Sequence, residues 1–278
     1  MGKEIGRSVN IVIGTRIIAV SNQKGGTGKT TTVINLATSL SELGRRVLVV
    51  DLDPQANLTS GLGFHTSDDS VSSYDLVMNR VRADDVIQTG PNENMDVVRS
   101  GIELAGAETE LIGEIGRERR LQHALSGIVR RNSGHEYKYI IIDTPPTLGI
   151  LMVNALSTAT DVIIPTPPAA FAISGLEQLI NIIGTVQERV NPHLVGWRIL
   201  MTMIDKRRNE DRTMKDGMRE RFGSQVFDTE IRTNTRLIEA ARLGIPVHHH
   251  DRSCVGSHDY ADLAREIEGV DGGDQVRG

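Results

Sequence analysis

Cysteine is almost absent from this 278-residue sequence, which contains Cys254 and no other. A lone thiol cannot form a disulfide within the chain, nor can it complete a zinc site built from cysteines alone. The same count excludes an iron–sulfur protein of the kind that takes two cysteine ligands from each subunit. Cys254 is therefore predicted to be an inert thiol in a reducing compartment.

Long apolar runs are lacking as well. The longest, such as residues 139–142 and 162–164, have the length of a strand. They fall far below the roughly 20 residues needed to span a bilayer. The first residues also lack the apolar stretch of a signal peptide. These absences predict a cytoplasmic protein.

Positive charge is not in excess either. The sequence holds 31 Lys and Arg against 36 Asp and Glu, which gives a net charge of −5. Such a chain is, as a whole, no electrostatic match for nucleic acid. Any DNA binding therefore has to come from a local basic patch.

The length of the chain suits one large α/β domain with a sizeable core. We expect residues 1–278 to form a single domain, with residues 1–15 as a short leader and residues 269–278 as a flexible tail. A leader of this length is too short to hold a helix-turn-helix module.

The most informative stretch is residues 21–32, which read S-N-Q-K-G-G-T-G-K-T-T-T. An apolar run with strand character, residues 16–20, precedes it, and apolar residues recur at helical spacing through residues 29–43. A glycine-rich turn between a strand and a helix points several backbone N–H groups, and the positive end of the helix, into one small space. The stretch therefore predicts a phosphate-binding loop.

This loop departs from the ordinary P-loop pattern G-x-x-x-x-G-K-[ST], since Gln23 occupies the first glycine position. Gly28, Lys29 and Thr30 keep the rest of the pattern. Lys29 is expected to reach the β- and γ-phosphates of a nucleotide, and the Thr30 hydroxyl to bind Mg²⁺. Lys24 is the unusual residue. Lys29 would repel this second lysine unless it points elsewhere or serves the phosphates of another subunit.

Two later apolar runs end in aspartate. Residues 46–50 lead into Asp51 and Asp53, and residues 139–142 lead into Asp143, which is followed by Thr-Pro-Pro. Parallel strands place such carboxylates at the carboxyl edge of the sheet, where open α/β sheets bind ligands. Asp143 has the Walker B arrangement and is expected to hold Mg²⁺ directly or through water.

Together these motifs closely resemble those of the ParA/Soj partition family of deviant Walker A ATPases, whose relatives include MinD. The family pattern K-G-G-x-G-K-T-T stands at residues 24–31, and the resemblance continues through residues 47–63, 102–112, 139–156 and 228–246. It implies a single α/β P-loop NTPase domain, in which a mostly parallel twisted sheet carries helices on both faces. It also implies ATP and Mg²⁺ as cofactors.

The resemblance assigns roles to particular residues. Lys24 would contact nucleotide across an ATP-dependent homodimer and act in catalysis with Lys29. Asp53 would position the attacking water and help to bind the metal beside Thr30 and Asp143, with Asp51 supporting the Mg²⁺ shell. The nucleotide-binding residues would be those of the loop, namely Lys24, Gly25, Gly26, Thr27, Gly28, Lys29, Thr30 and Thr31.

Two segments late in the chain are modestly basic. Residues 205–222 hold seven Lys and Arg against five Asp and Glu, and residues 232–242 hold three Arg against one Glu. By resemblance, Arg207 and Arg236 match positions at which Soj-like proteins bind double-stranded DNA without reading its sequence. Charged helix faces are also often merely solvated, so the sequence leaves both interpretations open.

Two further segments were considered as binding sites. Recognition of adenine is expected near residues 231–237, without a residue assigned to it. His248, His249 and His250 suggest a metal site, but three consecutive histidines on an extended loop cannot all face one ion. A surface loop is therefore the predicted structure of this run.

The leading hypothesis is that of the family. It describes an ATP-driven dimeric switch that binds DNA nonspecifically on the nucleoid and partitions chromosomes or plasmids with a ParB-like centromere-binding partner. One alternative is a MinD-like positioning protein on a membrane. That role would need an amphipathic helix at the C-terminus, which residues 268–278 provide poorly. The other is a metabolic P-loop enzyme with the same nucleotide chemistry.

Overall fold

The computed structural model describes residues 14–65, 71–129, 137–168 and 172–273. Most of the predicted leader (residues 1–13) and the end of the predicted tail (residues 274–278) therefore lie outside the described residues. Within these ranges seven strands form one sheet in the order β3-β4-β2-β5-β1-β6-β7. They are β1 (Arg16–Val20), β2 (Val47–Asp51), β3 (Ile87–Thr89), β4 (Met95–Val98), β5 (Tyr139–Asp143), β6 (Asp161–Thr166) and β7 (Gly196–Met201).

The sheet is parallel except at one edge, where β3 runs antiparallel to β4. Its central strands are mostly apolar, and every residue of β2 and β5, including the aspartate that ends each strand, is buried. Strands of this kind need helices on both faces, because side chains leave a strand alternately in both directions. The mostly parallel sheet that was predicted is therefore confirmed.

Helices cover both faces of the sheet. They are α1 (Lys29–Glu42), α2 (Asn57–Gly61), α3 (Ser73–Val77), α4 (Ala83–Val86), α5 (Leu104–Glu110), α6 (Arg120–Val129), α7 (Ile150–Thr158), α8 (Ala172–Arg189), α9 (Asn209–Phe222), α10 (Thr235–Leu243), α11 (Val247–His250) and α12 (Val255–Gly273). Short 3₁₀ turns lie at Leu111–Gly113, Arg117–Arg119 and Gly223–Gln225.

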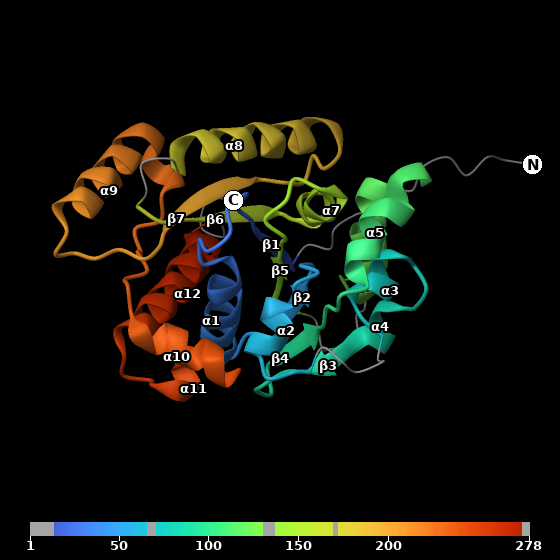
Figure 1. Cartoon of the computed structure of the whole chain (residues 1–278), viewed down its shortest axis with the longest axis horizontal. Helices are drawn as coiled ribbons and strands as arrows, with labels where there is room; N and C mark the ends of the chain where they lie inside the picture. Colours follow the sequence, from blue (N-terminus) through green and yellow to red (C-terminus); the bar gives the residue numbers. More distant parts are fainter. Residues whose placement is uncertain (1–13, 66–70, 130–136, 169–171, 274–278) are drawn as a thin grey trace, which may run out of the picture.

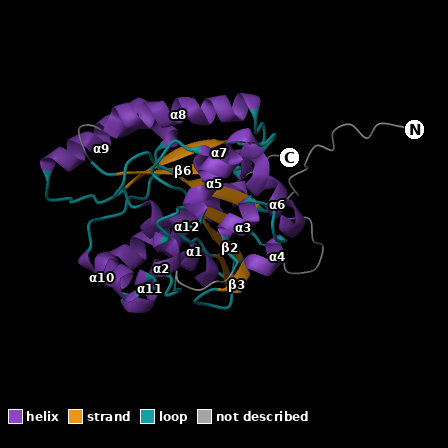
Figure 2. Ribbon diagram, turned by 45° about the vertical axis from the view of Figure 1, so that its right-hand side comes forward, coloured by secondary structure: helices purple, strands orange, loops and turns teal. Residues whose placement is uncertain are grey.

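Each face of the sheet has its own apolar core, which lies between the sheet and the helices that cover that face. In one core the sheet packs against α6, α7 and α8, and in the other it packs against α1, α2 and α12. Figure 1 shows α8 on one side of the sheet and α1 and α12 on the other. Figure 2 shows α10 and α11 beside α1 and α2. In the described part of the chain no helix is both long and apolar enough to cross a bilayer.

Two local predictions are wrong. Residues 269–273 of the predicted tail belong to α12, whose buried Leu263 and Ile267 pack in the same core as α1. Glu268 holds the end of this helix, because its carboxylate accepts the hydroxyl of Tyr139 and pairs with Arg45 at 2.6 Å. Tertiary contacts thus extend α12 into a glycine-rich stretch.

Residues 248–250 also differ from the prediction, since they lie in the short helix α11 and not on an extended loop. Val247, the first residue of this helix, is buried, and its N–H donates to Asn35 Oδ1 at 2.8 Å. A contact with α1, more than 200 positions away, therefore fixes the start of α11.

The sheet brings the predicted acidic residues together. Asp51 pairs in register with Asp143 on β5, and Asp143 pairs with Val20 at the end of β1. The loop that follows β1 therefore begins beside both carboxylates. The central strand β1 lies between β5 and β6, where the direction of strand order reverses, which is the usual ligand crevice of an open α/β sheet.

Candidate phosphate-binding site

The glycine-rich loop joins β1 to α1 and turns sharply at two glycines. Gly26 has φ 71° and Gly28 has φ 91°, values that residues with a side chain rarely adopt. Gly28 is the N-cap of α1, and its carbonyl accepts the N–H of Thr32 at 2.8 Å. The N–H groups of the first turn are thereby left facing the loop, as a phosphate site requires.

Neighbouring strands hold this loop in place. The side-chain amide of Asn22 donates to the carbonyl of Pro165 on β6 at 2.7 Å, and its oxygen accepts the N–H of Lys24 at 3.0 Å. Just after β7, the hydroxyl of Thr202 donates to the carbonyl of Thr27 at 2.9 Å. The loop is therefore shaped before any ligand arrives.

Lys29 is almost fully buried at the start of α1. Its Nζ donates to the carbonyl of Lys24 at 3.1 Å, so the ammonium folds back across the loop. Burial lowers its pKa below the usual range, and the charges of Asp143 and Asp53 partly oppose that shift. An anion in the loop would stabilise this buried cation.

The three carboxylates at this edge of the sheet differ in how well they are hydrogen-bonded. Asp51 accepts the Thr59 hydroxyl at 2.7 Å, the Thr59 N–H at 2.9 Å and the Asp53 N–H at 3.1 Å. Burial nevertheless raises the pKa of Asp51 to about 6. Asp53 accepts the N–H of Gln55 at 3.0 Å, and its carbonyl accepts the hydroxyl of Ser100 at 2.8 Å.

Asp143 is fully buried and less well bonded. Its Oδ2 accepts the Thr30 hydroxyl at 2.6 Å, while its Oδ1 has no hydrogen-bond partner within the described chain. Burial, followed by the charge of Asp51, raises the pKa of Asp143 well above the usual range. A divalent cation would relieve both effects. Hydroxyl and carboxylate oxygens are the ligands that Mg²⁺ prefers, so Thr30 and Asp143 fit this ion.

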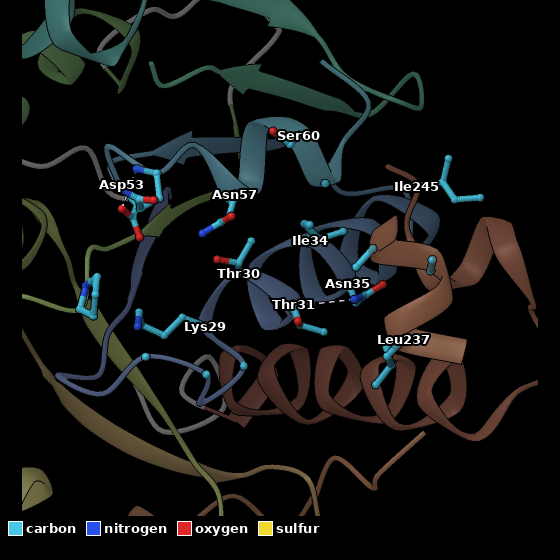
Figure 3. A pocket seen from close by; sticks show the side chains of 18 residues that line it. Lys29, Thr30, Thr31, Ile34, Asn35, Asp53, Asn57, Ser60, Leu237 and Ile245 are labelled. Atoms are coloured by element: carbon cyan, nitrogen blue, oxygen red, sulfur yellow. Dashed lines mark hydrogen bonds between the residues drawn. The ribbon is translucent and has the colours of Figure 1, made fainter. Parts of the chain in front are cut away.

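A pocket of about 430 Å³ opens over the loop, a size within the usual range for small-molecule sites. Lys29 and Asp53 lie at its polar end, and Leu237 and Ile245 at its apolar end (Figure 3). Of the eight predicted loop residues, six line the pocket, namely Gly25, Gly26, Gly28, Lys29, Thr30 and Thr31.

The remaining predicted residues lie beside the pocket or only at its edge. Lys24 and Thr27 are not among its described lining residues, and Asp51 and Asp143 lie behind Thr30. Of the segment 231–237, in which adenine recognition was expected, Leu237 lines the pocket.

Helices α2 and α10 together build the wall opposite the loop, and the sequence did not predict that these two helices meet. Asn57 and Ser60 of α2 and Ala240 and Ala241 of α10 line the pocket. These two helices are about 180 positions apart in the sequence, and although each lies in a segment that resembles the family, neither segment indicates their contact. Tertiary packing alone brings them together.

Two glycines join this wall. Gly63 (φ 81°) follows α2, and Gly244 (φ 66°) is the C-cap of α10. A β carbon on Gly63 would lie 3.1 Å from the carbonyl oxygen of Gly244, and one on Gly244 would lie 3.0 Å from the carbonyl oxygen of Ser60. The two backbones touch, and residues with side chains would hold them apart.

Comparisons with known proteins agree with this geometry. A family model described as an AAA domain matches residues 15–196. The sporulation initiation inhibitor protein Soj of Bacillus subtilis is 43% identical over 252 residues, which cover 91% of this chain and 98% of that protein. The chain belongs to the ParA/Soj family. This finding confirms the resemblance seen in the loop and in the two aspartate motifs.

Two other known proteins are similar to this chain over about the same length. The chromosome partitioning protein ParA of Caulobacter vibrioides is 39% identical over 91% of this chain and 93% of its own. A structure of cobyrinic acid a,c-diamide synthase from Mycobacterium smegmatis, with a bound ATP analog and magnesium, has a TM-score of 0.79 at 34% identity. That likeness covers 90% of this chain and 93% of the other.

The two arginines predicted to bind DNA lie outside the pocket of this ParA/Soj-family chain. Arg207 lies between β7 and α9, is strongly exposed, and binds Asp205 through Nε at 2.9 Å and Nη2 at 2.8 Å. Arg236 lies in the first turn of α10, where it pairs with Glu239 at 2.6 Å and with Asp251 at 3.4 Å. Each arginine is therefore exposed but already partnered by carboxylates of its own chain.

The three histidines contact acidic residues of two helices. His248 and His249 lie 3.7 and 3.8 Å from the carboxylate of Glu42, at the end of α1. His250 bonds Glu239 at 3.1 Å. Among the residues that the structure describes, no group of three His, Cys, Asp or Glu side chains is arranged to hold a metal. These side chains attach α11 to its neighbours.

Proposed function

We propose that this chain is an ATP-dependent switch that pairs with a second copy of itself, binds double-stranded DNA nonspecifically and hydrolyses ATP. The observation that carries the proposal is the arrangement at the polar end of the pocket. There the Thr30 hydroxyl contacts the buried Asp143 carboxylate, and the Lys29 ammonium lies on the phosphate-binding loop. Such an arrangement suits the triphosphate of a nucleotide together with Mg²⁺.

The residues of the pocket divide the work of hydrolysis between them. Lys29 would leave the carbonyl of Lys24 and move onto the β- and γ-phosphates, and Thr30 and Asp143 would hold Mg²⁺. When bound, the ion supplies positive charge to the transferred phosphoryl group. Asp53, at the same end of the pocket, would orient the attacking water. Positioning and charge neutralisation then account for the catalysis.

Lys24 is the residue on which the proposed dimerisation rests. Its backbone is fixed by Asn22 and Lys29, yet Lys24 is not among the described residues that line the pocket of its own chain. We propose, from the family pattern, that this lysine reaches the phosphates of a second copy. We propose that ATP drives this pairing, which joins the basic segments of two chains.

The biological role follows from family membership. The relatives named above include a chromosome partitioning protein, and we propose the same role here for a chromosome or a plasmid. The proposed partner is a ParB-like centromere-binding protein that stimulates hydrolysis. The switch would work in the cytoplasm, on the DNA of the nucleoid.

The deciding experiment measures DNA binding and self-association with ATP, with ADP and without nucleotide. The wild-type protein should form dimers and bind DNA only with ATP. Lys24→Ala should still bind ATP but should lose dimerisation, DNA binding and turnover. Arg252→Ala, an exposed arginine away from the pocket, is the control. Dimerisation and turnover that survive Lys24→Ala would refute the shared site, and DNA binding that ignores nucleotide would refute the switch.

A metabolic P-loop enzyme is the second candidate. It is favoured by the 34% identity to the structure described as a cobyrinic acid a,c-diamide synthase. Such an enzyme would consume ATP steadily in the presence of a small carboxylic acid, and DNA would not affect the rate. An ATPase assay that varies DNA and small acids separately distinguishes the two candidates.

A further inference from the structure

The loop between Asp143 and α7 is held at both ends. At its start the hydroxyl of Thr144 donates to the carbonyl of Val20 on β1 at 3.0 Å. Pro146, in the middle of the loop, lines the pocket. At its end lies Gly149, the N-cap of α7. The position of this loop therefore affects both Asp143 and the polar end of the pocket.

A carboxylate from another helix occupies the space beside Gly149. A β carbon on Gly149 would lie 1.8 Å from Oε1 and 2.8 Å from Cδ of Glu108, which belongs to α5. Glu108 can adopt this position only because residue 149 has no side chain. The contact joins α5 to the loop that begins at Asp143.

The Glu108 carboxylate and the N-terminus of α7 have complementary hydrogen-bonding groups, an acceptor on one side and N–H donors on the other. Oε1 of Glu108 is shielded from solvent and has no hydrogen-bond partner within the described chain. Gly149, the N-cap of α7, has no side chain with which to cap the helix. The first N–H groups of a helix have no partner within the helix, and its positive end favours a negative charge. A buried carboxylate oxygen without a hydrogen-bond partner is unfavourable. A small movement that brings the α7 N–H groups to this oxygen would therefore be favourable.

We propose that Glu108 is a positioning residue for the loop 144–149. When a nucleotide draws Pro146 and Asp143 into place, the loop shifts and the first-turn N–H groups of α7 bind the Glu108 carboxylate. The carboxylate then fixes the loop in the position needed for hydrolysis. This inference rests on the proposed ATP hydrolysis, and it adds to the site a residue from α5 to which the sequence assigns no role.

The first test is kinetic. Glu108→Ala should lower kcat for ATP about tenfold and change KM less than about twofold, because the loop positions reacting groups and does not hold most of the nucleotide. Glu108→Gln keeps an acceptor oxygen and should restore about a third or more of kcat. Glu110→Ala is the matched control, since Glu110 lies on the same helix but bonds Tyr74 and Arg80 at the surface. A kcat for Glu108→Ala equal to that of this control overturns the proposal.

Gly149→Ala tests the same contact from the other side. Its new methyl group should displace the flexible end of Glu108 and lower kcat by a similar factor. Because both substitutions break one contact, the double variant should be no slower than either single variant. Additive losses would show that the two residues act separately and would overturn the proposal. Equal melting temperatures across the variants exclude a general loss of folding.

Hydrogen exchange of the backbone N–H groups of residues 150–152 gives a readout that does not depend on turnover. An ATP analog with Mg²⁺ should slow this exchange in the wild-type protein and in Glu110→Ala, but not in Glu108→Ala. Nucleotide-dependent protection that persists in Glu108→Ala overturns the inference, as does its absence in a wild-type protein that binds the analog. Failure of the proposed ATP hydrolysis is distinguishable, because the wild-type protein would then release no phosphate from ATP.

Discussion

The polar end of the pocket and the arginine-bearing surface handle charge in different ways. In the pocket, Lys29 and Asp143 are buried. Burial lowers the pKa of Lys29 and raises that of Asp143, and both shifts favour the neutral form of the side chain. On the surface, Arg207 and Arg236 are exposed, and each contacts a carboxylate of its own chain. Water stabilises the surface charges, whereas the buried charges would gain more from a bound ligand.

This difference between buried and exposed charges indicates that the pocket is the region suited to bind a ligand. Buried charges are costly unless they are paired, so a cluster of them in a pocket indicates a binding role. Exposed ion pairs contribute little to stability, so they neither prove nor exclude a role in binding DNA. The four predictions below test this contrast, in order of decreasing expected effect.

Lys29→Ala should have the largest effect. Loss of the cation that neutralises the phosphates should lower ATP turnover by about 10²- to 10³-fold, as measured by phosphate release. The melting temperature of the nucleotide-free protein should not fall, because Lys29 is a charge that burial disfavours. The control is Lys206→Ala, a mostly exposed lysine that pairs with Glu230. Turnover that stays within threefold of the wild-type value would contradict the assignment.

Asp51 predicts how stability depends on pH. Its pKa is about 6 in the folded chain against 3.8 in the reference state, so the folded chain binds more protons between these values. Stability should therefore fall as the pH rises from about 4 to about 6, by an amount on the order of 3 kcal/mol. Asp143, whose pKa burial also raises, contributes with the same sign.

Calorimetry of wild type and Asp51→Asn in the presence of a chelator isolates this effect. As the pH rises from 4.5 to 7, the wild-type protein should lose stability relative to the variant. A difference in melting temperature that does not change with pH would show that Asp51 is ionised in the folded chain at all these values. The surface carboxylates are common to both proteins and cancel in the comparison.

Arg236→Ala should weaken ATP-dependent DNA binding about three- to tenfold and lower the slope of log affinity against log salt by about one. The same change is expected for Arg207→Ala. Fluorescence anisotropy with a labelled duplex at several salt concentrations measures both quantities. Arg242→Ala, on the last turn of α10, is the matched control. If all three variants bind alike, the predicted arginines are ordinary surface charges.

Glu239→Gln should have the smallest effect and the opposite sign. Glu239 binds both Arg236 and His250, so its neutralisation frees the arginine and removes a charge that repels phosphate. DNA affinity should rise about two- to threefold. Glu188→Gln, on α8 at the other face of the sheet, controls for the change in net charge. Unchanged affinity would show that Arg236 does not contact phosphate.

The sequence predicted the fold and the polar end of the pocket because there local pattern and chemistry coincide. Lys29 and Asp143 each lie directly beside an apolar run that becomes a strand or a helix, so strand order alone brings them together. The glycines at 26 and 28 adopt the positive φ angles that the loop pattern requires.

The remaining features depend on contacts between distant parts of the chain. Asn35 links α1 to α11 by accepting the N–H of Val247, and no local pattern in either segment indicates that bond. The same is true of the α10 wall and of the Glu108 carboxylate beside Gly149. Residues 248–250 were predicted to be a loop because local spacing could not show the anchor at Asn35. The role of Lys24 remains a prediction, since it concerns a second copy of the chain.

The contact between Gly63 and Gly244 has a mechanical consequence. Because the two backbones touch without intervening side chains, the end of α2 is tightly packed against the end of α10. A displacement of α2, which begins shortly after Asp53, would therefore move the C-terminal end of α10. Arg236 lies at the opposite end of that helix.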